Sequence, residues 1–323
     1  MKHQPVSTAR LLAATLVVAA LASCGGGGGG GGGAPAPVPT VALTASNAQN
    51  VAGDATNAGV QTAKKNPLLG LGAQLPGGGA PRTHVLSRFL ERQIGQILQS
   101  GPAIAAGLAP TAATTTNCQL SGTQTEDQSA GSIVRTFNAC SDAVGESING
   151  SIVISGISGT ASSISASIST NLTFSFTGFA DQTFTGNFGF SESVSGTLLT
   201  ITISGAALVL HTGTNTENLG SFTLTTTIDT STSGTTDTLT FSYSSTEIGG
   251  TVLVRTLTPF QIDPGSEKPH AGVLQIIGVN GSSIKVTVNG DELDPSPQVK
   301  IQLDADGDGV FELTLDKSWA ELS

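Results

Sequence analysis

The acidic residues near the C-terminus are spaced for metal chemistry. Asp304, Asp306 and Asp308 alternate along one short segment, Gly309 follows them, and Glu312 closes the run. Carboxylates two positions apart along a coiled loop can converge on one hard cation, and calcium takes six to eight oxygen ligands. Without a cation, several close carboxylates would repel one another. The segment predicts a structural calcium site; the alternative is a hairpin whose Asp-Gly pairs serve only the turn.

The flanks of this loop are predicted to be strands, because apolar residues alternate in Val299–Leu303 and again in Leu313–Leu315. The aspartate spacing resembles the start of an EF-hand loop, but the twelfth position is Leu315 and not glutamate. The arrangement is more similar to the strand–loop–strand calcium loops of integrin-type repeats, in which the acid at the ninth position closes the site. That resemblance implies side-chain ligation by Asp304, Asp306, Asp308 and Glu312 and carbonyl ligation by Val310.

The body that carries this loop is predicted to be a large sheet. From Ile164 to Phe176 the apolar residues fall on even positions and serines and threonines fall between them, which indicates a strand with one apolar face. In the next run, Gly186 indicates a bulge or a close contact. Similar runs, among them Leu199–Ile203 and Ala207–Leu210, recur to residue 257, separated by short polar turns, and favour an antiparallel meander. Ten or more such strands must curl or close. We expect a mainly β fold over residues 118–323, with a large curved antiparallel sheet arranged as a barrel, roll or sandwich.

An outer-membrane barrel is not expected, because such barrels carry aromatic girdles and Tyr243 and Trp319 are this chain's only Tyr and Trp. Residues 41–117 are predicted to be helical and linker segments. Small apolar residues at helical spacing favour a helix from Ser46 to about Lys64, and a stronger amphipathic pattern predicts one over Thr83–Ser100. We expect one or two of these N-terminal helices to pack on the sheet; a helix lying on the membrane surface is the alternative for Thr83–Ser100.

The N-terminal residues are predicted to be a lipoprotein signal peptide. Residues 1–23 combine a basic start, an apolar run over Leu11–Leu21 and small residues before Cys24. Leu21-Ala22-Ser23-Cys24 resembles the lipobox of bacterial lipoproteins, which implies lipidation of Cys24 and attachment to a Gram-negative envelope; several acyl chains together anchor a protein stably. An ordinary secretory signal with an incidental cysteine is the alternative. Gly25 stands where an aspartate would favour the inner membrane, so we expect the outer membrane, on its periplasmic side or at the cell surface.

Residues 24–40 are predicted to be a tether, since nine glycines precede an alternating Ala-Pro stretch. With Cys24 committed to lipid, Cys118 and Cys140 are expected to form one disulfide, as in other exported chains. A zinc pair is the alternative, but no histidine stands in a metal-ligand spacing.

The composition also disfavours several classes of function. The formal charge is -10, and only 11% of residues are charged, which disfavours nucleic acid as a partner. No nucleophile elbow, phosphate loop or zinc-protease motif is present, so no enzyme activity is expected. The whole resembles Ser/Thr-rich lipoproteins of Gram-negative bacteria that end in an Asp-x-Asp-Gly-Asp-Gly hairpin and a tryptophan, a resemblance that supplies no activity. We expect a membrane-tethered protein with a structural, adhesive or binding role; the alternative is a carrier that holds a lipid or another amphiphile between helix and sheet.

Overall fold

The structure is a computed structural model that describes residues 37–60, 111–129, 131–142, 144–160, 162–264, 266, 268–290 and 297–322. The predicted signal segment, Cys24, most of the tether and the predicted helix Thr83–Ser100 lie outside these residues, so those predictions stay predictions.

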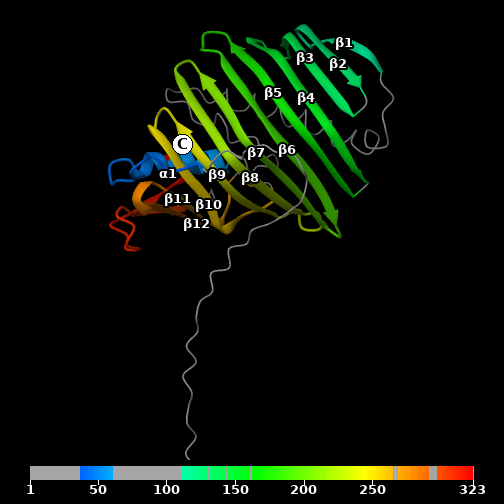
Figure 1. Cartoon of the computed structure of the whole chain (residues 1–323). Coiled ribbons are helices and arrows are strands. Elements are labelled where there is room, and N and C mark those ends of the chain that lie inside the picture. Colours follow the sequence, from blue (N-terminus) through cyan, green and yellow to red (C-terminus); the bar gives the residue numbers. More distant parts are fainter. Residues whose placement is uncertain are drawn as a thin grey trace, which may run out of the picture. The chain divides into compact units, whose positions relative to one another are not determined.

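One antiparallel sheet of fourteen strands dominates the described part of the chain, and each strand pairs with its neighbour in sequence (Figure 1). The strands are β1 (Thr111–Asn117), β2 (Ser121–Ser129), β3 (Ser132–Ser141), β4 (Glu146–Thr160), β5 (Ser163–Phe176), β6 (Gln182–Ser195), β7 (Leu198–Thr212), β8 (Asn215–Asp229), β9 (Thr235–Ser245), β10 (Gly250–Ile262), β11 (Ala271–Ile277), β12 (Ser283–Asn289), β13 (Val299–Asp304) and β14 (Leu313–Lys317). The helices are α1 (Ala48–Val60) and the short 3-10 helices η2 (Val279–Gly281) and η3 (Trp319–Leu322).

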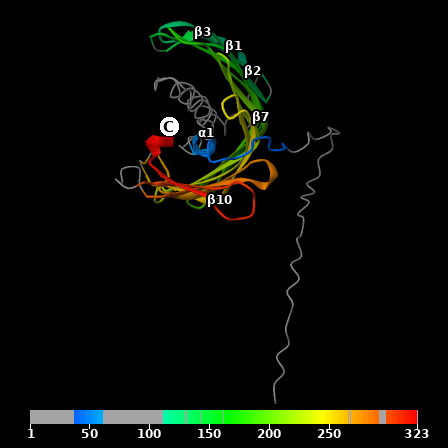
Figure 2. The ribbon, with the colours of Figure 1, turned by 90° about the vertical axis from the view of Figure 1, so that its left-hand side faces the viewer.

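The sheet is open and curled, with α1 on its concave side (Figure 2). Strands β1 and β14 are its two edges. This confirms the predicted mainly β fold and the large curved antiparallel sheet. The curl follows from the strand pattern, because one face is apolar and a sheet of this size buries that face by bending around it.

Strand β5 shows how the pattern works. Its even positions from Ile164 to Phe174 are buried, and the serines between them are exposed. The polar face continues across the sheet, because Ser165, Ser191, Thr202, Thr225 and Thr238 lie opposite one another on five consecutive strands. The outer face of this region therefore carries rows of neutral hydroxyl groups.

Gly186 was predicted to mark a bulge or a close contact, and it marks both. A Cβ atom at this position would lie 2.5 Å from the Leu208 side chain and 2.6 Å from the Ala207 carbonyl oxygen. The pairing of β6 with β7 shifts register immediately afterwards, between Asn187 and Phe188. Glycine is therefore required here because the neighbouring strand approaches too closely for a side chain.

The helix predicted over Ser46 to about Lys64 is present as α1, although Gly53 weakens its helical propensity. The reason for that glycine is packing: a Cβ atom on Gly53 would lie 3.1 Å from the main-chain oxygen of Leu322 in η3. Every α1 residue from Val51 to Ala58 is buried. The helix contacts η3 and strands β9, β11, β12 and β13. No helix within the described ranges is long and apolar enough to cross a membrane.

Two boundaries differ from the sequence prediction. The sheet begins with β1 at Thr111, seven residues before the expected start at Cys118, because an edge strand needs no apolar face and β1 is rich in exposed threonine. The two runs expected at Leu199–Ile203 and Ala207–Leu210 are one strand, β7, in which a bulge shifts the alternation between them.

Candidate metal centre

The acidic loop lies where the sequence places it, in the hairpin between β13 and β14. The two strands pair from Val299 with Lys317 to Leu303 with Leu313. Just beyond the last pair, the Glu312 N–H donates to the Leu303 carbonyl over 2.9 Å. Ile301 and Leu303 anchor the hairpin in the core, so the loop leaves the sheet from a fixed base. The predicted strand–loop–strand arrangement is confirmed.

Two glycines let this loop fold back on itself. Gly307 has φ 80° and Gly309 has φ 87°, values in the left-handed region that glycine adopts without strain. Gly307 also packs closely on η2, because a Cβ atom there would lie 3.0 Å from the Gly281 carbonyl oxygen. The Asp-Gly pairs therefore set both the turn and the contact between the loop and the body.

The loop backbone fixes the four carboxylates. Asp304, which is 6% exposed, accepts hydrogen bonds from the Gly307 N–H at 2.7 Å and from the Gly309 N–H at 3.0 Å. The other three acids each accept one backbone N–H bond: Asp306 from Asp308 (3.2 Å), Asp308 from Val310 (2.7 Å) and Glu312 from Ala305 (2.7 Å). These bonds orient the carboxylates and leave other oxygen lone pairs available to a ligand.

The four side chains converge. Asp304, Asp306, Asp308 and Glu312 each offer one oxygen atom, and these atoms all lie within 4.8 Å of one another. Asp304 is buried at the base, and the other three are exposed. Oxygen atoms 2.3–2.6 Å from a calcium ion can be up to about 5 Å apart, so this spacing fits a shared calcium ion. The side chain of Val310 is 62% exposed, and ligation by its carbonyl remains a prediction.

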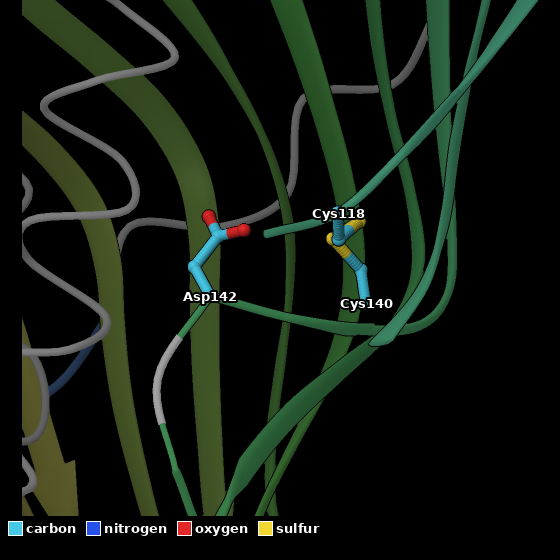
Figure 3. A group of neighbouring side chains, drawn as sticks. All are labelled: Cys118, Cys140 and Asp142. Carbon is cyan, nitrogen blue, oxygen red and sulfur yellow. A yellow bond between two sulfur atoms is a disulfide. The ribbon is translucent and has the colours of Figure 1, made fainter. Parts of the chain in front are cut away.

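The cysteine prediction is confirmed. Cys118 and Cys140 form a disulfide with their Cα atoms 5.4 Å apart, which ties the turn after β1 to the end of β3 (Figure 3). Asp142 lies beside this disulfide, and its Oδ1 atom accepts a hydrogen bond from the Gln119 N–H at 3.1 Å. Because both sulfur atoms are bonded to each other, this group is a covalent brace and not a thiolate metal site.

Sequence reasoning missed two buried acids on the concave side. Asp54 on α1 is 7% exposed and Asp237 on β9 is 0% exposed. Burial raises the pKa of both carboxyl groups, to about 6 for Asp54, with a further contribution from Glu247, and to about 7 for Asp237. For Asp237 a signal was available, since it shares the alternation of Leu239, Phe241 and Tyr243 on β9. For Asp54 no local pattern exists, because its acidic neighbours come from other elements.

Comparison of the chain with models of protein families, with curated proteins and with solved structures finds no match.

Proposed function

We propose that this chain is a lipid-tethered, non-catalytic protein of the bacterial envelope whose C-terminal hairpin binds a structural calcium ion. The observation that carries the calcium proposal is the convergence of four carboxylates on the β13–β14 loop. The tether proposal is supported by the lipobox-like segment that ends at Cys24.

Calcium would reduce the repulsion among the four acids and join both ends of the loop. Asp304 stands at the end of β13 and Glu312 directly precedes β14, so one ion held by both would lock the hairpin at the edge of the sheet. Through Gly307 the same loop contacts η2, so the ordering would extend into the body. This is a structural role, and it needs no reacting group near the ion.

The calcium proposal is tested on the mature chain by calorimetric titration and by thermal unfolding in calcium or in chelator. We expect binding at the loop and a stabilisation of about 2.7 kcal/mol when calcium exceeds the dissociation constant a hundredfold. The double variant Asp306→Asn with Asp308→Asn should lose this binding. Asp316→Asn removes an exposed acid on β14 and is the matched control. Unchanged calcium binding in the double variant would rule out the loop as the site.

The tether is tested separately, by detergent-phase partition and by mass spectrometry of the mature N-terminus. The natural chain should enter the detergent phase and carry acyl groups on Cys24, whereas Cys24→Ser should remain in the aqueous phase. An unmodified residue 24 in the natural protein would refute the tether without affecting the calcium proposal.

For the adhesive or binding role, the supporting feature is the neutral hydroxyl face of β5–β9. A depression of about 270 Å³ lies among these strands, where serine and threonine hydroxyls share the lining with Ala166, Phe190 and two glycines. A carrier of lipid would instead use an apolar chamber between helix and sheet. The row of hydroxyl groups across β5–β9, and not the depression, therefore favours a polar, uncharged partner.

A further inference from the structure

One end of the sheet gathers most of the exposed large apolar side chains. Because each strand pairs antiparallel with its neighbour in sequence, successive connections alternate between the two ends of the sheet, and the β1–β2, β3–β4, β5–β6 and β13–β14 connections share one end. Nine large apolar residues of the described chain are exposed, and five of them lie in these four connections: Leu120, Val144, Phe179, Val310 and Phe311. The side chain of Val144 packs on almost nothing, since this residue is 94% exposed.

The N-terminal segment joins the body at the same end. The Thr40 N–H donates to the Thr251 carbonyl over 2.8 Å, just after the β9–β10 turn. The Val279 N–H, in the β11–β12 connection, donates to the Val41 carbonyl over 2.9 Å. A further apolar residue, Val38, stands two positions before Thr40 and is 73% exposed. The predicted tether, which ends at residue 40, therefore meets the body at the end with the exposed apolar residues, which we call the entry end.

The connections at the entry end form one rim. The Leu120 N–H donates to the Ser141 carbonyl over 2.8 Å, which joins the first two of them. The Thr177 N–H donates to the Gly145 carbonyl, also over 2.8 Å, which joins the next pair. On the other side of the chain entry, the β13–β14 loop packs on η2 through Gly307. The exposed apolar side chains are therefore carried by turns that their neighbours hold in place.

The charge of the entry end disfavours an anionic partner. Its turns hold Asp142, Asp181, Glu247 and the four acids of the β13–β14 loop, and their described residues include no lysine or arginine. Anionic lipids and nucleic acids attract basic residues, so this surface would repel them. A zwitterionic phospholipid carries no net charge, and apolar side chains can enter the boundary between its head groups and acyl chains.

We propose that the entry end docks on the surface of a zwitterionic phospholipid bilayer, with Leu120, Val144 and Phe179 inserted at the boundary between head groups and acyl chains. This inference rests on the proposed tether, which keeps the bilayer close to the entry end. The tether raises the effective concentration of the bilayer, so a few inserted side chains suffice to hold the contact. The strands would then point away from the membrane, and the hydroxyl face of β5–β9 would stay accessible to a partner.

The orientation is tested in the lipidated chain reconstituted in vesicles of zwitterionic phospholipid. A polarity-sensitive fluorophore is attached through Val144→Cys, or through Leu198→Cys at the opposite end of the sheet. Because Cys118 and Cys140 are bonded to each other and Cys24 carries the lipid, the introduced thiol is the one that reacts. We expect a blue-shifted emission at position 144 that lipid-borne quenchers reduce, and an emission typical of water at position 198.

A matched pair of double variants separates this contact from the tether. The background is the mature chain with Cys24→Ser, which carries no lipid, at high vesicle concentration. Leu120→Ser with Val144→Ser removes two apolar side chains from the entry end and should weaken partition into the vesicles by about tenfold or more. Val194→Ser with Leu198→Ser removes the same residue types from the opposite end and should change partition by less than about twofold. All four residues are at least 43% exposed, so folding should be preserved, which urea unfolding checks.

The results that contradict the docking differ from those that contradict the tether. A label at position 144 that stays in water, or an equal loss of partition in both double variants, would overturn the docking even where Cys24 is acylated. A blue shift that needs no vesicles and grows with protein concentration would identify a second copy of the chain as the partner, and would also overturn it. An unmodified Cys24 would refute the tether alone, since the partition assay uses a chain without lipid.

Discussion

Asp237 gives the most direct test of how burial controls the stability of this sheet. The carboxyl lies on β9, opposite Thr226 of β8 and Phe260 of β10. Its Oδ1 atom accepts a hydrogen bond from the Thr226 hydroxyl at 2.6 Å, and its Oδ2 atom has no partner. Burial raises the pKa of this group, and the bond from Thr226 opposes the rise only in part. We predict that Asp237→Asn removes a pH-dependent loss of stability.

The magnitude follows from the two pKa values, 3.8 as the ordinary value and about 7 in the folded protein. At pH values between these two pKa values, the carboxyl keeps its proton in the folded state and has lost it in the unfolded state. The contribution of the Asp237 carboxyl to the free energy of unfolding is therefore fully present below the pKa of the unfolded state. It is lost as the pH rises through the pKa of the folded state. The total loss is about 4 kcal/mol, of which about 2.5 kcal/mol falls between pH 5 and pH 8. Asparagine does not titrate in this range, so the variant should gain that difference relative to the natural chain.

The assay is urea unfolding followed by circular dichroism at pH 5, 6, 7 and 8. Asparagine keeps the oxygen that accepts from Thr226 but buries an amide N–H group without an acceptor, which costs about 1–3 kcal/mol at every pH. The slope of the difference with pH is therefore the measured quantity, and not its absolute value. Thr226→Val retains the carboxyl and removes the hydrogen bond that lowers its pKa, so the slope should be at least as steep as in the natural chain. If Asp237→Asn and the natural chain show parallel pH profiles, the carboxyl is not buried as an acid and the reasoning is wrong.

The remaining predictions concern the disulfide and the glycines of β6. Replacing Cys118 and Cys140 with serine opens a closed loop of 22 residues, and unfolding should become easier by about 3 kcal/mol, measured by urea unfolding; the variant should also become insensitive to reductant. Gly186→Ala should destabilise the sheet by about 1–3 kcal/mol, because the new Cβ atom would overlap Leu208. Gly189→Ala is its control on the same strand, since the nearest atom is 3.7 Å away, and a similar loss in both variants would contradict the packing argument.

How much the sequence predicts depends on whether a feature is local. The strand β5, the close contact at Gly186 and the acidic loop all lie within short segments, so periodicity and spacing predicted them. The disulfide was predictable because, of the three cysteines, Cys24 was assigned to the lipid anchor and the other two leave one pairing. Strand β1 was missed, since an edge strand with exposed threonines has no alternation to detect.

The acids that line a small cavity under α1 could not be predicted from any local segment. Asp54, Glu217 and Glu247 line one small cavity but come from α1, β8 and the turn after β9, and their positions in the sequence follow no motif. Only the curl of the sheet and the insertion of α1 bring them together. Asp237 lies between these cases: the alternation of β9 predicts that it faces inward, but its high pKa depends on burial by other strands.

The acidic loop is connected to α1 through the segment that precedes this helix. The β13–β14 loop packs on η2 through Gly307, and the Val279 N–H of η2 donates to the Val41 carbonyl at 2.9 Å. Residue 41 leads directly to α1, where Asn57 donates to the Leu322 carbonyl over 2.6 Å, across 265 residues of sequence.

All fourteen strands pair with sequence neighbours, so the sheet itself needs no such distant contact. Among the described residues, the segment from Thr40 to α1 contacts β10, η2 and η3, so these distant contacts support the curl around α1. A calcium ion bound at the β13–β14 loop would therefore also stabilise the packing of the sheet around its first helix, through Gly307, η2 and Val41.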